Sequence, residues 1–200
     1  MLLPILLSVA PAMAQAPDEQ TAQTEMLGID VPDEFEVGYQ ARGDTTQIME
    51  LVEPPETVDS WSKLVTGLIF LNAAQRGLDS FSGQWRDNMR RSCAGMTNTM
   101  VRGSVDGMPA LRATFSCPKN PQTGEPENLE TVLVQGRVNL MMVQIAFRRS
   151  VTPADIALIE RVAGSMKVCD QRALSSCSAR TATGFLPVND ASRSTPPRRA

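Results

Sequence analysis

The sequence predicts an α+β domain: a single antiparallel sheet of about six or seven strands against which two or three helices pack. Three observations predict this fold. Two pairs of strand-like runs meet at short turns, an amphipathic helical pattern precedes them, and a well-capped helical segment follows them. Hydrophobic residues make up 42% of the 200 residues and charged residues 20%, which excludes a wholly disordered chain and a multi-span membrane protein.

The first expected element is a hairpin over residues 35–53. Apolar residues alternate with polar ones from Phe35 to Ala41, residues 42–44 supply a turn, and two prolines follow the second strand. Thr57 is typical of a helix N-cap, so we expect a short helix after it. Its buried face would carry Val58, Trp61 and Leu64.

Residues 64–71 are consistent with either a helix or a strand. Gly67 and the β-branched content favour a buried strand. From Asp79 to Ser92 the apolar period becomes helical, because four large apolar side chains lie on one stripe: Leu78, Phe81, Trp85 and Met89.

Two further hairpins follow. Residues 97–105 and 108–117 flank Asp106-Gly107, which is the strongest short hairpin signal. A loop with three prolines leads to strands over 129–135 and 138–148. The last of these strands is apolar on both faces, which predicts a central position in the sheet.

The final helix is expected to begin after Thr152. A threonine cap, a proline at the first helical position and Asp155 in the first turn are all typical of a helix start. The expected buried stripe consists of Ile156, Ile159, Val162, Ala163 and Met166.

These elements resemble a known group of proteins. Their order, the segments 31–39 (VPDEFEVGY) and 56–62 (ETVDSWS), and the ending KVCD at 167–170 resemble uncharacterised exported proteins of Gram-negative bacteria. The architecture is similar to the PsbP-like α+β fold and would cover residues 35–170. This resemblance implies an accessory or assembly module. It implies no site residues, because none of the matching segments is a catalytic motif.

The N-terminus predicts export. Residues 2–10 are apolar but too short to span a bilayer, and Ala12-Met13-Ala14 would allow cleavage before Gln15. A later cut before Pro17 and a buried N-terminal strand or helix are the alternatives. We therefore expect four regions: a signal peptide at 1–14, an acidic flexible leader at 15–34, the domain at 35–170, and a disulfide-tied loop with a disordered basic tail at 171–200. The expected location is periplasmic or secreted, without a transmembrane segment in the mature chain.

Four cysteines in an exported chain allow three disulfide pairings. The order of the elements favours Cys93–Cys117 and Cys169–Cys177. Because no C-x-x-C spacing occurs and an oxidising compartment favours bridges, we expect no metal site.

Charge is distributed unevenly. Residues 1–59 carry twelve acidic and one basic residue, whereas residues 60–200 carry ten acidic and eighteen basic residues. The acidic N-terminal hairpin is expected to pack against a basic later surface. A candidate anion patch consists of Arg86, Arg90 and Arg91, joined by residues 148–149, although such a run is usually a solvated face. The expected partner is an envelope protein or an anionic envelope surface. Nucleic acid is excluded by the pI near 5 and the scarcity of aromatic residues; the oligomeric state is open.

Catalytic motifs are scarce. The chain has no histidine, which excludes Ser-His-Asp and Cys-His nucleophile systems. Ser60 and Lys63 match the S-x-x-K motif of penicillin-binding proteins, but the companion motifs are absent. We therefore expect no catalytic residues, no cofactor and a non-enzymatic periplasmic accessory or binding module. The alternatives are a cell-envelope hydrolase or transferase of unrecognised type, and a small-ligand carrier.

Overall fold

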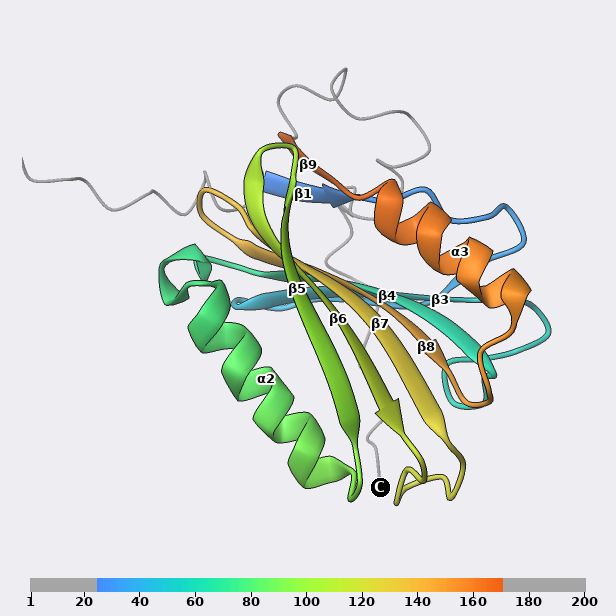
Figure 1. The fold of residues 1–200 in the computed structure, drawn as a ribbon. Helices are drawn as coiled ribbons and strands as arrows, with labels where there is room; N and C mark the ends of the chain where they lie inside the picture. Colours follow the sequence, from blue (N-terminus) through green and yellow to red (C-terminus); the bar gives the residue numbers. More distant parts are fainter. Residues whose placement is uncertain (1–24, 171–200) are drawn as a thin grey trace, which may run out of the picture.

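The computed structural model describes residues 25–170 and confirms the α+β class. A seven-stranded sheet, antiparallel throughout, is accompanied by two helices and a two-stranded sheet (Figure 1). In spatial order the large sheet contains β2 (Glu36–Arg42), β3 (Thr46–Val52), β4 (Lys63–Phe70), β8 (Leu140–Phe147), β7 (Glu127–Gln135), β6 (Met108–Cys117) and β5 (Thr97–Val105). The small sheet pairs β1 (Glu25–Gly28) with β9 (Lys167–Asp170). A 3-10 turn η1 (Ala74–Arg76) precedes the first helix.

The two helices lie on opposite faces of the large sheet (Figure 1). On one face, α2 (Leu78–Ser92) packs Phe81 and Trp85 against the sheet. On the other face, α3 (Pro153–Gly164) and the β1–β9 pair cover the larger apolar cluster. The central strand β8 serves both layers, because Met141 contributes to the cluster under α3 and Met142 to that under α2. This confirms its predicted central position.

Several local predictions are confirmed. The strands on either side of Asp106-Gly107 have the predicted bounds, and both turn residues have positive φ, 50° and 75°, as a two-residue hairpin turn requires. Residues 63–70 form a strand, as Gly67 and the β-branched content favoured. At the last helix, Thr152 and Asp155 form a capping box in which each side chain accepts from the other residue's backbone N–H.

The prediction of a flexible leader at 15–34 is wrong for residues 25–34. Residues 25–28 form a strand, and Met26, Leu27 and Ile29 are 4%, 1% and 5% exposed. Glu25 ties this strand to the turn between β7 and β8, because its carboxylate accepts hydrogen bonds from the backbone N–H groups of residues 137–139. The domain therefore includes residues from Glu25 onward.

Two helix predictions need correction. No helix follows Thr57; instead Thr57 and Ser60 exchange backbone hydrogen bonds of 3.0 Å in a tight turn. The Glu56 carboxylate holds this turn by accepting from the N–H and the hydroxyl of Ser62, at 2.9 and 2.6 Å. In α3 the predicted stripe is correct at Ile159, Val162 and Met166, but its first position is wrong, since Ile156 is 53% exposed while Leu158 is buried.

Some predictions lie outside the described residues. These are the signal peptide at 1–14, the first part of the leader, the tail at 171–200 and the partner position Cys177. Between residues 25 and 170, neither helix has the length and apolarity needed to cross a membrane.

Candidate functional site

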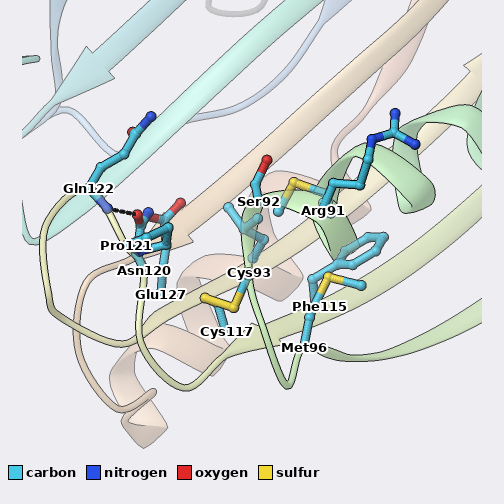
Figure 2. A pocket seen from close by; sticks show the side chains of 12 residues that line it. Arg91, Ser92, Cys93, Met96, Phe115, Cys117, Asn120, Pro121, Gln122 and Glu127 are labelled. Atoms are coloured by element: carbon cyan, nitrogen blue, oxygen red, sulfur yellow. Dashed lines mark hydrogen bonds between the residues drawn. A yellow bond between two sulfur atoms is a disulfide. The ribbon is translucent and has the colours of Figure 1, made fainter.

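A pocket of about 310 Å³ opens on the α2 side of the sheet (Figure 2). It lies between the last turn of α2, the adjoining ends of β6 and β7, and the loop that connects these two strands. Apolar residues form its floor, namely Met89, Met96, Phe115 and Leu129. Polar residues form its rim, namely Arg91, Ser92, Asn120, Gln122 and Glu127.

The Cys93–Cys117 disulfide forms one wall of this pocket and confirms the predicted pairing. The bridge joins the residue that follows α2 to the last residue of β6, with 5.9 Å between the two Cα atoms. Both cysteines are buried. The bridge therefore fixes the end of the helix relative to the sheet. The second predicted bridge involves Cys177, outside the described residues.

The rim is ordered by its own hydrogen bonds. Asn120 donates from Nδ2 to Glu127 Oε2 at 2.6 Å and accepts the Gln122 N–H at Oδ1, at 2.9 Å (dashed in Figure 2). Backbone bonds close the loop at its other side, because the Gly124 N–H donates to the Asn120 carbonyl and the Asn120 N–H to the Glu125 carbonyl. Gly124 has φ 79°, which a residue with a side chain rarely adopts. The loop thus presents a preformed rim.

The floor combines a rigid part with an adaptable part. Phe115 is 1% exposed and packs edge-on against Trp85, with 4.5 Å between the ring centroids. Met89 and Met96 are only partly buried. Because methionine is unbranched and polarisable, these two side chains can adapt to groups of different shape.

The predicted anion patch is dispersed. Arg86 contacts Asp87, Arg90 contacts Asn98 at 3.5 Å, and Arg91 contacts Asn88 at the pocket rim. Residues 148–149 do not join them: the Arg148 guanidinium lies 3.9 Å from the centroid of the Trp61 ring, and Arg149 pairs with Asp155. Of the three predicted residues, Arg91 alone lines the pocket.

The S-x-x-K residues do not form a nucleophile–base pair. Ser60 lies in the tight turn rather than at a helix start, and Lys63 forms an ion pair with Glu53. Burial alone would raise the pKa of Glu56, but the hydrogen bonds from Ser62 outweigh it and hold the pKa below its ordinary value. An ionised carboxylate stabilised in this way is a weak general base.

Within residues 25–170 the charge asymmetry has a long-range counterpart. Arg161 on α3 pairs with Asp30, at 3.2 Å, so a basic residue of the later chain meets an acidic residue of the N-terminal segment. The acidic residue lies before the predicted hairpin, in the segment expected to be flexible.

The pocket itself was missed by sequence reasoning. The loop that forms its rim was predicted only as a surface excursion. The available signals were the cysteine at the start of this loop and its predicted partner at the end of a helix. Together they require the loop to lie beside the last helical turn.

Comparisons with known proteins give likenesses of fold. No family model matches the chain, and no curated protein matches its sequence. Cyanobacterial PsbP (CyanoP) from Synechocystis sp. PCC 6803 is similar over 81% of this chain and 98% of its own, with 10% identity and a TM-score of 0.45. The Ran-binding protein Mog1p of Saccharomyces cerevisiae is similar over 74% of this chain and 96% of its own, with 10% identity and a TM-score of 0.48. LpqN of Mycobacterium tuberculosis, which is involved in cell envelope biogenesis, is similar over 73% of this chain and 84% of its own, with 9% identity and a TM-score of 0.43. At these TM-scores, function has to be argued from this chain's own residues.

Proposed function

We propose that this protein is an exported, non-enzymatic binding module whose pocket beside Cys93–Cys117 receives an apolar side chain of a cell-envelope protein. The observation that carries the proposal is the preformed pocket with an apolar floor and a polar rim. A bridge fixes one wall and a hydrogen-bonded loop fixes the rim. Such preorganisation lowers the entropic cost of binding.

The size of the pocket favours a single anchoring side chain. Its volume of about 310 Å³ is at the lower end of the range, about 300–1,000 Å³, in which pockets enclose small-molecule ligands. One large apolar side chain would displace water from the partly exposed Met89 and Met96 on the floor. The side chains of Gln122 and Arg91 at the rim would then lie within reach of the partner's backbone.

Export and lack of catalysis are parts of the same proposal. Disulfides persist in oxidising compartments, which agrees with a periplasmic or secreted location and with the predicted signal peptide. N-terminal sequencing of the exported protein should begin at Gln15. Absence of catalysis is supported by the chain's lack of histidine and by the pairing of Lys63 with Glu53.

A crosslinking experiment tests the binding role. A photoreactive amino acid at Gln122, in cells of the native host, should give a defined adduct with an envelope protein. In that background Ser92→Trp should block the pocket and reduce the adduct by at least tenfold. Gln84→Trp is the matched control, because Gln84 is exposed two turns earlier on α2 and does not line the pocket.

Two outcomes would contradict the proposal. Equal adducts in Ser92→Trp and Gln84→Trp would show that the pocket is not the contact site. A small molecule that co-purifies with the protein and is lost only in Ser92→Trp would instead support the small-ligand carrier, which the same pocket volume allows.

A further inference from the structure

The edge of the large sheet at β5 is long and regular. Among the described residues β5 pairs only with β6, and its nine residues keep one register without a bulge. It contains no proline and one charged residue, Arg102, whose guanidinium pairs with Asp79 on α2. Proteins usually protect such an edge with proline, charges or bulges, because free backbone groups attract a further strand.

The opposite edge of the sheet is protected. In β2 the register shifts between Val37 and Tyr39, and the strand begins and ends with exposed charged residues, Glu36 and Arg42. A bulge and terminal charges are the devices that discourage pairing. The contrast identifies β5 as the edge that is open to a partner.

The hairpin turn determines which backbone groups of β5 face outward. In a two-residue hairpin the residues beside the turn, Val105 and Met108, form a hydrogen-bonded pair. Alternate residues from Val105 back to Thr97 therefore bond to β6. The N–H and C=O groups of the four residues between them point away from β6: Asn98, Met100, Arg102 and Ser104.

A large apolar side chain lies at the middle of this edge. Val101 is 65% exposed, more than any other large hydrophobic residue among those described. Because Met100 packs in the cluster under α2, Val101 lies on the opposite face of the sheet. Its neighbours on that face of β5 are Thr99 and Gly103, which are also exposed.

We propose that β5 is the interface of a homodimer in which two copies pair antiparallel about a two-fold axis at Val101. Hydrogen-bonded pairs can form only between outward-facing residues. An axis at Val101 pairs Met100 with Arg102 of the second copy, and Asn98 with Ser104, so all four outward-facing residues are used.

Neighbouring registers are less favourable. An axis at Arg102 would place two arginines directly opposite each other, which is destabilising. An axis at Met100 would leave Ser104 without a partner inside the strand. The axis at Val101 avoids both problems, and it buries the exposed Val101 side chain against its own copy in a close, non-hydrogen-bonded pair.

The size of this contact sets the expected affinity. One strand pair buries less surface than the roughly 1,200–2,000 Å² of a standard stable interface. We therefore expect a concentration-dependent dimer, with a dissociation constant in the micromolar range. This inference is independent of the pocket, which lies on the other face of the sheet.

Cysteine crosslinking of the purified chain tests the register. Across a non-hydrogen-bonded pair the Cα atoms are about 4.5 Å apart, within the range of a disulfide, so Val101→Cys should form a covalent dimer on mild oxidation. Thr99→Cys is the control, because Thr99 is also exposed on the same face of β5. In the dimer it would lie opposite Gly103, about 13 Å along the strand from its own copy, and should crosslink at least tenfold less.

A second pair of variants tests association without crosslinking. By analytical ultracentrifugation Val101→Lys should remain monomeric at concentrations where the wild type dimerises, whereas Thr99→Lys should retain the dimer. Because both positions are exposed, we expect both variants to fold. A wild type that is monomeric at millimolar concentration, or equal crosslinking of the two cysteine variants, would overturn the inference.

Discussion

Removal of the Cys93–Cys117 bridge should destabilise the domain strongly. The bridge closes a loop with a sequence separation of 24 residues. In the chain-entropy description, such a loop stabilises the folded state by about 3.5 kcal/mol, a large share of the roughly 5–15 kcal/mol of an ordinary domain. For a domain of this size about 2–4 °C is lost per kcal/mol, so Tm should fall by about 7–14 °C.

The double variant Cys93→Ala with Cys117→Ala suits this measurement, because both positions are buried and alanine adds no buried hydroxyl group. Tm is measured by circular dichroism, and the free energy of unfolding by urea denaturation. The wild type under reducing conditions should fall at least as far, because reduction opens the Cys93–Cys117 bridge together with any bridge made by Cys169. A fall of less than 3 °C would refute the reasoning, since it would show that the bridge does not constrain the unfolded chain.

Three further predictions concern other residues. The hydrogen bond from Arg149 holds the pKa of the buried Asp155 well below its ordinary value, so the pair stabilises the fold above about pH 4 and this contribution is lost as pH falls. Asp155→Asn should cost about 3 kcal/mol at pH 7 and roughly 1 kcal/mol less at pH 3, with the rest lost only at still lower pH, measured by urea denaturation. In Gly136→Ala the new Cβ would lie 2.5 Å from the Glu25 carboxylate; it should cost about 1–3 kcal/mol, and little in a Glu25→Ala background. Ser60 should give no adduct with a β-lactam probe by mass spectrometry; a stoichiometric adduct would contradict the non-enzymatic proposal.

Elements encoded by neighbouring residues were predictable. The hairpin at Asp106-Gly107 needs only two residues that tolerate positive φ between two strand-like runs, and both turn residues have it. The α3 cap needs only Thr152 and Asp155, which are three residues apart. In both cases the stabilising contacts lie within a few residues, so the local sequence contains the whole signal.

Elements that depend on distant partners were not predictable. β1 has four residues and pairs with β9, about 140 residues later in the chain. Its apolar content is too small for a recognisable strand pattern, and the acidic residues around it are typical of a flexible segment. The helix expected after Thr57 was wrong for a different reason. The Glu56 carboxylate accepts from the backbone and hydroxyl of Ser62, six residues later, so a turn and a helix compete for the same local donors.

The candidate site was predicted in part. The Cys93–Cys117 pairing followed from the order of the elements, and the apolar stripe of α2 included Met89. The polar rim could not be predicted from the sequence, because Asn120 contacts Glu127 only after the loop has folded back on itself. The prediction of an arginine patch was wrong, because the positions of charged residues in a sequence do not show which carboxylate, amide or aromatic ring each guanidinium will contact.

The pocket and the open edge depend on the same hairpin, and the bridge holds both. Cys93 lies four residues before Thr97, where β5 begins, and Cys117 is the last residue of β6. Thr97 is opposite Ser116 in the register, next to the bridge. The covalent link therefore fixes the start of the edge strand as well as the pocket wall, at the side of the sheet farthest from β2. An edge strand has hydrogen bonds on one side only, so the link adds a covalent constraint where the backbone pairing is sparse. The bridge thus constrains one of the two edge strands, the one that lacks the bulge of β2 and is therefore left open to a partner.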